Sequence, residues 1–515
     1  MGVNVVSVRC STKMGKGMDV LCRCRDQNAK GWKGVAGCFV LFVSVVALIA
    51  SGCTTNPATG ESAFTLFMSP ADEVRVGAQE HPKILARFGG AYEDPRVGGY
   101  VAEIGGRLAA NSEMSRFPFT FTVLNSPEVN AFALPGGYVY VTRGLLALAN
   151  SEAELAAVIG HEIGHVVARH TAQRYSQSVA AGVGAALLGA VVGGATQQLA
   201  QLGSELYLAG FSREQEFEAD QLGVRYLKNA GYESYAMGGF LKNLIRNKTL
   251  QEQIRDDDLP NADFFSTHPN TPDRVARAAA AGAVGVVGRD ALLQNVAGLV
   301  FGDDPSQGLI RGRRFSHPDL GLTFEAPPGF RLTNTQQAVY ARKRNAAIVR
   351  FDAARRDEAH PDPRIYLTEI WALNTALSNV ERISIGGLPA ATASARVSGS
   401  LDDYRGPLDA RFVAVQFPSN KLFRLLFLSV PTQTSGLETD FRRTTFSLRT
   451  LSSTEISQLV PLTVEVLDVR PGSTSESLAA GLPFSSLRLE RFRVLNGFNP
   501  GDQPVPGEKV KVIAE

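Results

Sequence analysis

The spacing of apolar residues after position 150 predicts a buried helix. Four apolar residues recur at the spacing of one helix face, and no proline follows before position 177: Leu155, Val158, Ile159 and Val166. Ser151 stands before this stretch as a good N-cap, and Glu154 three residues later completes a capping-box pattern. We therefore expect a helix that begins after Ser151.

Other stretches of the first half show equally local patterns. Ser69-Pro70 and Asp94-Pro95 each read as an N-cap followed by a proline at the first helical position. Ser212 caps a further helix that runs to about Ala230, with a glycine after it as a C-cap signal. Residues 119–123 alternate phenylalanine and valine with threonine, which is typical of a strand.

The second half changes in character. Residues 287–315 contain Gly, Asp and Pro followed by an arginine cluster, and we interpret them as a linker. Residues 316–455 alternate short apolar runs with turns and include one helical pattern, which predicts a small α+β domain of unknown role. Residues 462–515 are predicted to form a strand, two helices and a second strand.

The N-terminal 52 residues have the pattern of a signal peptide. Arg23, Arg25 and other cations precede an apolar run at 39–50, which is too short for a comfortable membrane span. Small residues then lead to Cys53, as at a bacterial lipoprotein processing site, so Cys53 is the predicted lipidated residue. The alternative is an uncleaved N-terminal anchor. Residues 53–68 would be a tether to the domain at 69–286.

Composition narrows the class of protein further. The 515 residues are 44% hydrophobic and 20% charged, which describes a globular protein with several domains. The net charge of +2 gives no basic field for nucleic acid. The apolar segment 179–195 contains five glycines, which favours a small-residue helical hairpin near the active site over a membrane span. A plug or a membrane contact remains an alternative for this segment.

The candidate chemistry lies on the helix after Ser151. Residues 161–165 read His-Glu-Ile-Gly-His, with two histidines four residues apart and a glutamate beside the first. On a helix, His161 and His165 share one face about 6 Å apart along the axis, which suits two imidazoles on one zinc ion. Glu162 lies about 100° around the helix, from where it reaches a metal-bound water as general base. The alternative is a fortuitous surface pair, but the apolar flanks argue for burial.

Two histidines leave a zinc site unfinished, because a catalytic zinc usually has three protein ligands. Glu216 and Asp220 are four residues apart on the helix after Ser212 and share one face. We expect Glu216 as the third ligand and Asp220 behind it or near the substrate, whereas Glu218 points away. The alternative is a solvated acidic face. His268 either approaches the metal or caps a turn.

The run Tyr138–Thr142 follows a Pro-Gly-Gly turn and is rich in β-formers. If this strand lies at a sheet edge, an extended peptide can pair with it. We therefore expect substrate contacts at Asn130, Tyr138, Val139 and Tyr140. An ordinary core strand is the alternative.

Four motifs in this order resemble one family of zinc metalloendopeptidases: N-A-F-A-L-P-G-G at 130–137, H-E-I-G-H at 161–165, E-F-E-A-D at 216–220 and S-T-H-P at 266–269. The family includes the CAAX prenyl protease and HtpX, and the chain is most similar to its periplasmic lipoprotein branch, the BepA-like proteases. The resemblance covers roughly residues 55–285 and implies a mainly helical gluzincin-type domain with a small sheet. The chain shows neither the tetratricopeptide repeats of BepA-like proteins nor the long spans of HtpX.

The same resemblance implies roles for the candidate residues. His161, His165 and Glu216 would hold one zinc ion per chain, and Glu162 would act as general base. Asp220 would be a further active-site residue, often assigned as proton donor. His268 would swing onto the zinc in a resting state or assist at the transition state.

Residues 462–515 resemble a LysM domain, a βααβ module that binds peptidoglycan. Four short stretches carry this likeness: 471–474 (PGST), 478–479 (LA), 495–496 (LN) and 506–510 (PGEKV). A LysM-like fold used only for packing is the alternative.

The expected protein is thus an α+β multidomain endopeptidase of the bacterial cell envelope. It would be lipid-anchored at the periplasmic face of the outer membrane and would hydrolyse misfolded or stalled envelope proteins. The alternative is a latent protease that acts mainly as a chaperone-like or peptidoglycan-binding lipoprotein.

Overall fold

The computed structural model describes ten stretches of the chain: 53–60, 62–179, 210–254, 264–269, 272–279, 282, 284–355, 360, 362–418 and 421–515. The expected signal peptide and residues 180–195 of the apolar segment lie outside these stretches. Among the described residues, no helix is both long and apolar enough to cross a membrane.

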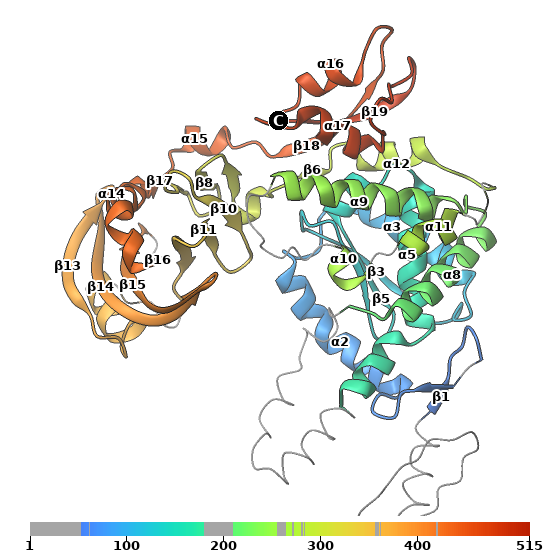
Figure 1. Cartoon of the computed structure of the whole chain (residues 1–515), viewed down its shortest axis with the longest axis horizontal. Helices are drawn as coiled ribbons and strands as arrows, with labels where there is room; N and C mark the ends of the chain where they lie inside the picture. Colours follow the sequence, from blue (N-terminus) through green and yellow to red (C-terminus); the bar gives the residue numbers. More distant parts are fainter. Residues whose placement is uncertain are drawn as a thin grey trace, which may run out of the picture. The chain divides into compact units, whose positions relative to one another are not determined.

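The first part of the described chain surrounds a three-stranded sheet with helices (Figure 1). Its elements up to the sheet and just after it are β1 (Cys53–Thr55), β2 (Ser62–Phe64), α2 (Pro70–Arg87), α3 (Pro95–Ala110), β3 (Thr120–Leu124), β4 (Ala131–Leu134), β5 (Tyr138–Thr142) and α4 (Arg143–Leu148). Ser69 and Asp94 cap α2 and α3 with their side chains, as the sequence predicts. Local capping chemistry therefore sets where both helices begin.

The strand β5 lies in the middle of this sheet, so the prediction that Tyr138–Thr142 is a sheet edge is wrong. β3 pairs with β5 in parallel on one side, and β4 pairs with it antiparallel on the other. The tight turn at Gly136 and Gly137, both with φ near +80°, folds β5 back onto β4. Both edges of β5 are thereby paired, and β4 is the outer strand on that side.

The helix α5 (Glu152–Val167) forms the centre of the apolar core. The Ser151 hydroxyl accepts the Glu154 N–H, as expected for the cap. The Glu154 carboxylate, however, accepts the N–H of Asn150 and not that of Ser151, so the predicted capping box is shifted by one residue. All thirteen residues from Leu155 to Val167 are buried, including His161 and His165.

The helix α8 (Arg213–Asn229) crosses α5 at very short range. Glycines stand at the crossing: a Cβ added at Gly223 would lie 3.0 Å from the backbone nitrogen of His161, and one at Gly164 would lie 3.0 Å from the carbonyl oxygen of Ala219. Such distances are tighter than ordinary packing, so a larger residue would push the two helix backbones apart. Ser212 caps α8, and Gly231 with φ 83° follows its end, both as predicted.

The described residues of this part include four further helices: α9 (Ala236–Ile254), α10 (Phe264–Thr267), α11 (Pro272–Ala279) and α12 (Arg289–Val296). The last of these, together with β6 (Val300–Phe301), falls in the stretch predicted to be a linker. The arginines of that stretch belong to a hairpin, because Arg314 and Arg313 both face the Glu325 carboxylate. The linker is therefore largely structured.

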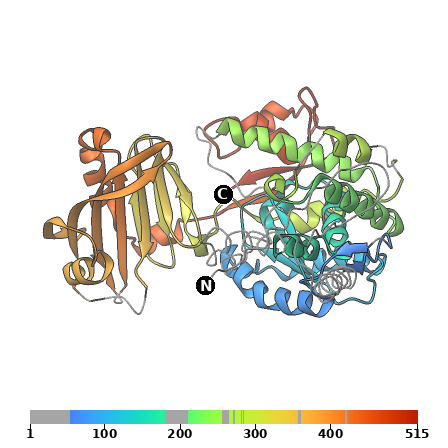
Figure 2. The same cartoon turned by 60° about the horizontal axis from the view of Figure 1, so that its bottom comes forward.

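The region from residue 309 to 450 consists mainly of two antiparallel sheets. Figure 2 shows its yellow to orange strands side by side. A four-stranded sheet has the order β17-β9-β8-β7, and a seven-stranded sheet has the order β10-β11-β12-β16-β15-β14-β13. Their bounds are β7 (Leu309–Arg311), β8 (Arg314–His317), β9 (Leu322–Glu325), β10 (Arg331–Asn334), β11 (Val339–Lys343), β12 (Ala347–Ala353), β13 (Ser378–Ile385), β14 (Leu388–Leu401), β15 (Tyr404–Gln416), β16 (Leu422–Ser429) and β17 (Arg449–Thr450).

One long helix, α14 (Pro431–Ser447), and four short helical pieces accompany these sheets in the described residues. The short pieces are η2 (Pro305–Gln307), α13 (Pro363–Ile365), η3 (Tyr366–Trp371) and α15 (Ser453–Ser457). The helical pattern expected within residues 316–455 rests on Ile365, Ile370, Leu373 and Leu377. The helical structure there ends at Trp371, and Leu373 is 65% exposed. Sequence analysis missed α14. A proline at its first position and the buried pair Leu437 and Phe441 were the available signals.

The C-terminal stretch has the predicted order of strand, helix, helix and strand: β18 (Leu462–Asp468), α16 (Ser475–Ala480), α17 (Arg488–Asn496) and β19 (Lys509–Ala514). Its β18 pairs with β6, and its apolar side chains share one buried cluster with α4 and α5. The Lys511 ammonium is fully buried and donates to the carbonyl oxygens of Ala147 and Ala149. Residues 462–515 thus pack against α4 and α5, which is the alternative role that the sequence left open for them.

The close contact of Gly223 on α8 with the backbone of α5 leads to a first prediction. We expect Gly223→Ala to lower the free energy of unfolding by about 1–3 kcal/mol, because the new methyl group meets helix backbone that cannot rotate away. Urea unfolding followed by circular dichroism measures this change.

The matched control is Gly106→Ala, an exposed position in the middle of α3 where a Cβ meets nothing within 4 Å. This substitution should stabilise the protein by about 0.5–1 kcal/mol through helix propensity. Equal stabilisation by both substitutions would show that the helices are not in close contact.

Candidate metal centre

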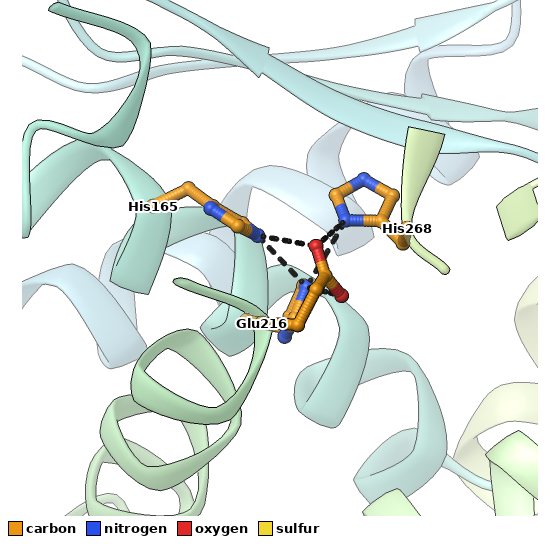
Figure 3. Close-up of side chains that lie close together, drawn as sticks. His165, Glu216 and His268 are labelled. Carbon is orange, nitrogen blue, oxygen red and sulfur yellow. Dashed lines mark hydrogen bonds and ion pairs between the residues drawn. The ribbon is translucent and has the colours of Figure 1, made fainter. Parts of the chain in front are cut away.

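Four side chains from three parts of the fold meet at one point. His161 and His165 come from α5, Glu216 from α8, and His268 directly follows α10. One donor atom from each lies within 4.8 Å of every other. Figure 3 shows the carboxylate of Glu216 between the rings of His165 and His268. All four residues are buried, at 0–2% exposure.

The distances within this group suit a tetrahedral metal ion. Two donors about 2.0–2.1 Å from one zinc ion lie roughly 3.3–3.4 Å apart at the tetrahedral angle. The Nε2 atoms of His161 and His165 are 3.0 Å apart, and Glu216 Oε1 is 3.4 Å from the His165 Nε2. Glu216 Oε2 lies 3.6 Å from the His161 Nε2. A set of imidazole and carboxylate donors at these separations fits zinc.

His268 fills the fourth corner of the group. Its Nδ1 lies 3.2 Å from the His161 Nε2 and 3.1 Å from Glu216 Oε1. Its Nε2 lies 3.4 Å from Glu162 Oε1. The ring therefore stands where a catalytic site would need room for water and substrate.

Glu162 is placed beside the group and is not one of its donors. Its side chain is fully buried, and neither carboxylate oxygen receives a hydrogen bond from the described residues. Burial raises the pKa of this carboxyl group above its usual range, since desolvation penalises the charged form. A buried carboxylate of raised pKa is suited to accept a proton.

The electrostatics of the group balance burial against charge. Burial alone would raise the pKa of Glu216, but His268 and His165 outweigh it and hold that pKa well below its usual value. Burial likewise works to lower the pKa of His268, while the carboxylates of Glu162 and Glu216 raise it above its usual value. The group is therefore held together by charge pairs in an environment without solvent.

Asp220 lies on the outer side of His161. Its Oδ1 is 2.9 Å from the His161 Nδ1, and Arg274 donates to both of its carboxylate oxygens at 2.7 and 2.8 Å. Arg274 also reaches Glu216 Oε2 at 2.5 Å. Asp220 thus faces the nitrogen that points away from the centre, and Arg274 ties the two acids of α8 together.

Of the residues predicted for the site, the structure brings together His161, Glu162, His165, Glu216, Asp220 and His268. Of the four predicted substrate contacts, Asn130, Val139 and Tyr140 are buried and Tyr138 is partly buried. Val139 and Tyr140 are at 0–1% exposure, and the Tyr140 hydroxyl is 2.7 Å from the His81 Nδ1. The backbone N–H of Asn130 donates to the Thr142 hydroxyl, and its carbonyl oxygen accepts the Thr142 N–H.

Sequence analysis passed over His170 and gave Arg274 no role. The His170 Nδ1 lies 2.8 Å from the His165 Nδ1, so this ring also adjoins the centre. A third histidine five residues after the motif, in a chain with seven in total, was the available signal. For Arg274 the signal was a cation following the S-T-H-P motif.

Buried His-Glu-x-x-His on one helix, completed by a glutamate from a second helix, defines a metalloprotease domain. Comparison with known proteins agrees: residues 95–281 match the model of Peptidase family M48. This part of the chain is therefore similar to the M48 peptidases, which supports a metalloprotease.

Relatives of known name match part of this chain. The beta-barrel assembly-enhancing protease of Escherichia coli (strain K12) is 30% identical over 244 residues, which cover 45% of this chain and 48% of that protein. The putative protein of the same name from Vibrio cholerae is 32% identical over 40% of this chain and 43% of its own length. The mitochondrial metalloendopeptidase OMA1 of Arabidopsis thaliana is 35% identical, over 32% of each chain. The chain spans about half the length or less of these relatives.

The geometry of Glu216 makes a second prediction. We expect the purified protein to contain about one zinc ion per chain and Glu216→Gln to lose most of it, because a neutral amide is a poor zinc ligand. Elemental analysis after dialysis measures the zinc content. Glu214→Gln is the matched control, since Glu214 is an exposed acid on the same helix. Equal zinc content in all three proteins would remove Glu216 from the ligand set.

Proposed function

We propose that this protein is a zinc-dependent endopeptidase of the bacterial cell envelope that hydrolyses peptide bonds. The observation that carries the proposal is the position of Glu216, which lies 3.4–3.6 Å from both imidazole Nε2 atoms of the His-Glu-x-x-His helix. The match to an M48 domain supports the same reaction class.

In this proposal each residue of the centre has one role. His161, His165 and Glu216 hold the metal ion with three donors that need no rearrangement of the backbone. When bound, zinc supplies Lewis acidity that polarises a carbonyl and acidifies a water molecule. Glu162 would accept the proton of the attacking water, for which a buried carboxyl group of raised pKa is suited.

Asp220 is best supported as an orienting residue for His161. A carboxylate on the outer nitrogen of a metal-ligating histidine fixes the tautomer and raises the basicity of the ligand. The two hydrogen bonds from Arg274 fix the carboxylate in turn. The family resemblance implies that Asp220 is a proton donor. For that role its side chain would need a different position, because here it faces His161 Nδ1 and points away from the centre.

The peptide is proposed to lie along β4. This strand is the outer strand of the sheet beside α5, and no other strand among the described residues pairs with its second edge, so an extended chain can pair there. Ala131–Leu134 replace the Tyr138–Thr142 segment in this role. Misfolded or stalled envelope proteins are the proposed substrates, in line with the names of the bacterial relatives. Lipidation at Cys53 and attachment to the outer membrane belong to the same proposal.

A second candidate function is supported by the position of His268. Because this ring occupies the fourth corner of the centre, the protein would rest as a latent protease and act meanwhile as a binding or chaperone-like lipoprotein. Release of His268 would then be the step that exposes the metal ion to substrate.

A cleavage assay tests the proposed reaction. We expect the full-length protein to cleave casein and Glu162→Gln to lower the rate by about 10²–10⁴-fold, because the amide cannot take the proton. His268→Ala should raise the rate if the ring blocks the centre.

The zinc content of both variants serves as the control and should equal that of the wild type. Equal cleavage by wild type and Glu162→Gln would contradict the mechanism. Zinc-loaded protein that binds casein without cleaving it, with or without His268, would favour the chaperone-like function.

Glycan binding by residues 462–515 is a separate proposal that rests on the LysM resemblance and on the observed strand, helix, helix, strand order. We expect isolated peptidoglycan to retain the full-length protein in a pull-down. Soluble N-acetylglucosamine oligomers should release it, because they compete for a glycan site and not for a charged surface. A folded protein that stays in the supernatant would leave only the packing role.

A further inference from the structure

A second histidine pair lies beside the metal centre, and the proposed mechanism does not use it. His170 is fully buried, and its Nδ1 is 2.8 Å from the Nδ1 of His165. The other ring nitrogen, Nε2, lies 3.1 Å from Glu218 Oε2. Glu218 is on α8, two residues beyond the ligand Glu216. The helix α8 thus contacts His165 in two ways. Glu216 lies beside its Nε2, and Glu218 acts through His170 on its Nδ1.

A break in the chain brings His170 into this position. In an unbroken helix a residue five positions after His165 would lie about 140° away from it around the axis. Instead α5 ends at Val167, and Arg169 takes the left-handed value of φ 56° before helical structure resumes at His170. The Arg169 guanidinium donates to the Met68 carbonyl oxygen and to the Glu73 carboxylate, which holds the break in place.

The contacts determine where the protons of both rings sit. An ionised carboxylate only accepts hydrogen bonds, so Glu218 requires the His170 proton on Nε2. The His170 Nδ1 is then an acceptor, and the proton between the two Nδ1 atoms belongs to His165. His165 consequently presents an unprotonated Nε2, which is the atom that faces the Nε2 of His161 and the Glu216 carboxylate.

The Glu218 carboxylate is itself fixed by the segment that follows Cys53. The Asn56 amide donates to Glu218 Oε1 at 2.6 Å, and Asn56 is 4% exposed. The Asn56 Oδ1 accepts the N–H of Ala58 at 2.9 Å, which fixes which way the amide points. Both oxygens of Glu218 therefore have a partner, one from the N-terminal segment and one from His170.

We propose that His170 and Glu218 are positioning residues that hold His165 in its metal-binding tautomer, and that Asn56 fixes Glu218 for this purpose. The two metal-binding imidazoles are then held from outside by different devices: His161 by Asp220 directly, and His165 by the relay of His170, Glu218 and Asn56. This inference rests on the proposed zinc site. It links the first residues after Cys53 to the geometry of a metal ligand.

The test measures zinc affinity in the full-length protein by competition with a chromophoric chelator. His170→Leu removes the acceptor for the His165 Nδ1 and should weaken zinc binding about 10–100-fold. His170→Asn places an amide oxygen near the position of the lost Nδ1 and should restore most of the affinity. Glu218→Ala should behave like His170→Leu, and Asn56→Ala should have a smaller effect because Glu218 keeps its contact with His170.

Glu214→Ala is the matched control, since it removes an exposed acid from the same helix and should leave the affinity unchanged. A second readout follows the tautomer itself. With ¹⁵N-labelled histidine, only seven side chains contribute signals. The His165 Nδ1 should give the signal of a protonated nitrogen in the zinc-loaded wild type and in His170→Asn, and should change in His170→Leu.

Wild-type zinc affinity and an unchanged His165 signal in His170→Leu would overturn this inference while leaving the zinc site intact. Weakened affinity in both His170→Leu and His170→Asn to the same extent would also overturn it, because loss of packing would then explain the result. A wild type that binds zinc but cleaves no peptide refutes only the proposed protease function. A wild type without zinc affinity refutes both.

Discussion

The contact on which the rest of the structure depends is the close crossing of α5 and α8. Glycines at the crossing allow backbone to meet backbone, as at Gly223 against the nitrogen of His161. At this range the short Glu216 side chain reaches the imidazoles of a different helix. The metal centre is thus a consequence of residues that carry no functional group.

Burying several ionisable groups in one place would ordinarily be unfavourable. Glu162, Glu216, Asp220, His268 and Arg274 all lie below 8% exposure, in an apolar core where an unpaired charge costs several kcal/mol. The structure offsets this cost by pairing opposite charges, with Arg274 between the two acids of α8 and His268 between Glu162 and Glu216. A divalent cation at the point where the four metal-binding side chains converge would add to this balance, since three carboxyl groups face only two basic side chains among these five residues.

Local sequence was sufficient for the helices of the site and for the residues on their faces. Ser151 and Ser212 are capping residues whose effect spans one turn, so the start of α5 and α8 could be predicted. The partner of a strand is not a local property. Tyr138–Thr142 has the same β-rich pattern whether one edge or both are paired, and its place between β3 and β4 is decided by the fold. His170 is similar, because its approach to His165 depends on one left-handed residue at Arg169.

The elements that supply the four donors are not equally anchored. His161, His165 and Glu216 stand on helices of 16 and 17 residues whose long faces are buried against each other. His268 follows a helix of four residues that is tied to its surroundings by backbone hydrogen bonds from Phe264 to Val129 and from Phe211 to Thr267. Besides its pairs with Glu162 and Glu216, the His268 ring stacks on Phe264 of the same short helix, with ring centroids 4.5 Å apart. In the proposed mechanism a substrate carbonyl needs the corner that the His268 ring fills. Displacing a helix of four residues is then a smaller rearrangement than separating two helices of 16 and 17 residues, so His268 is the donor that this proposal moves.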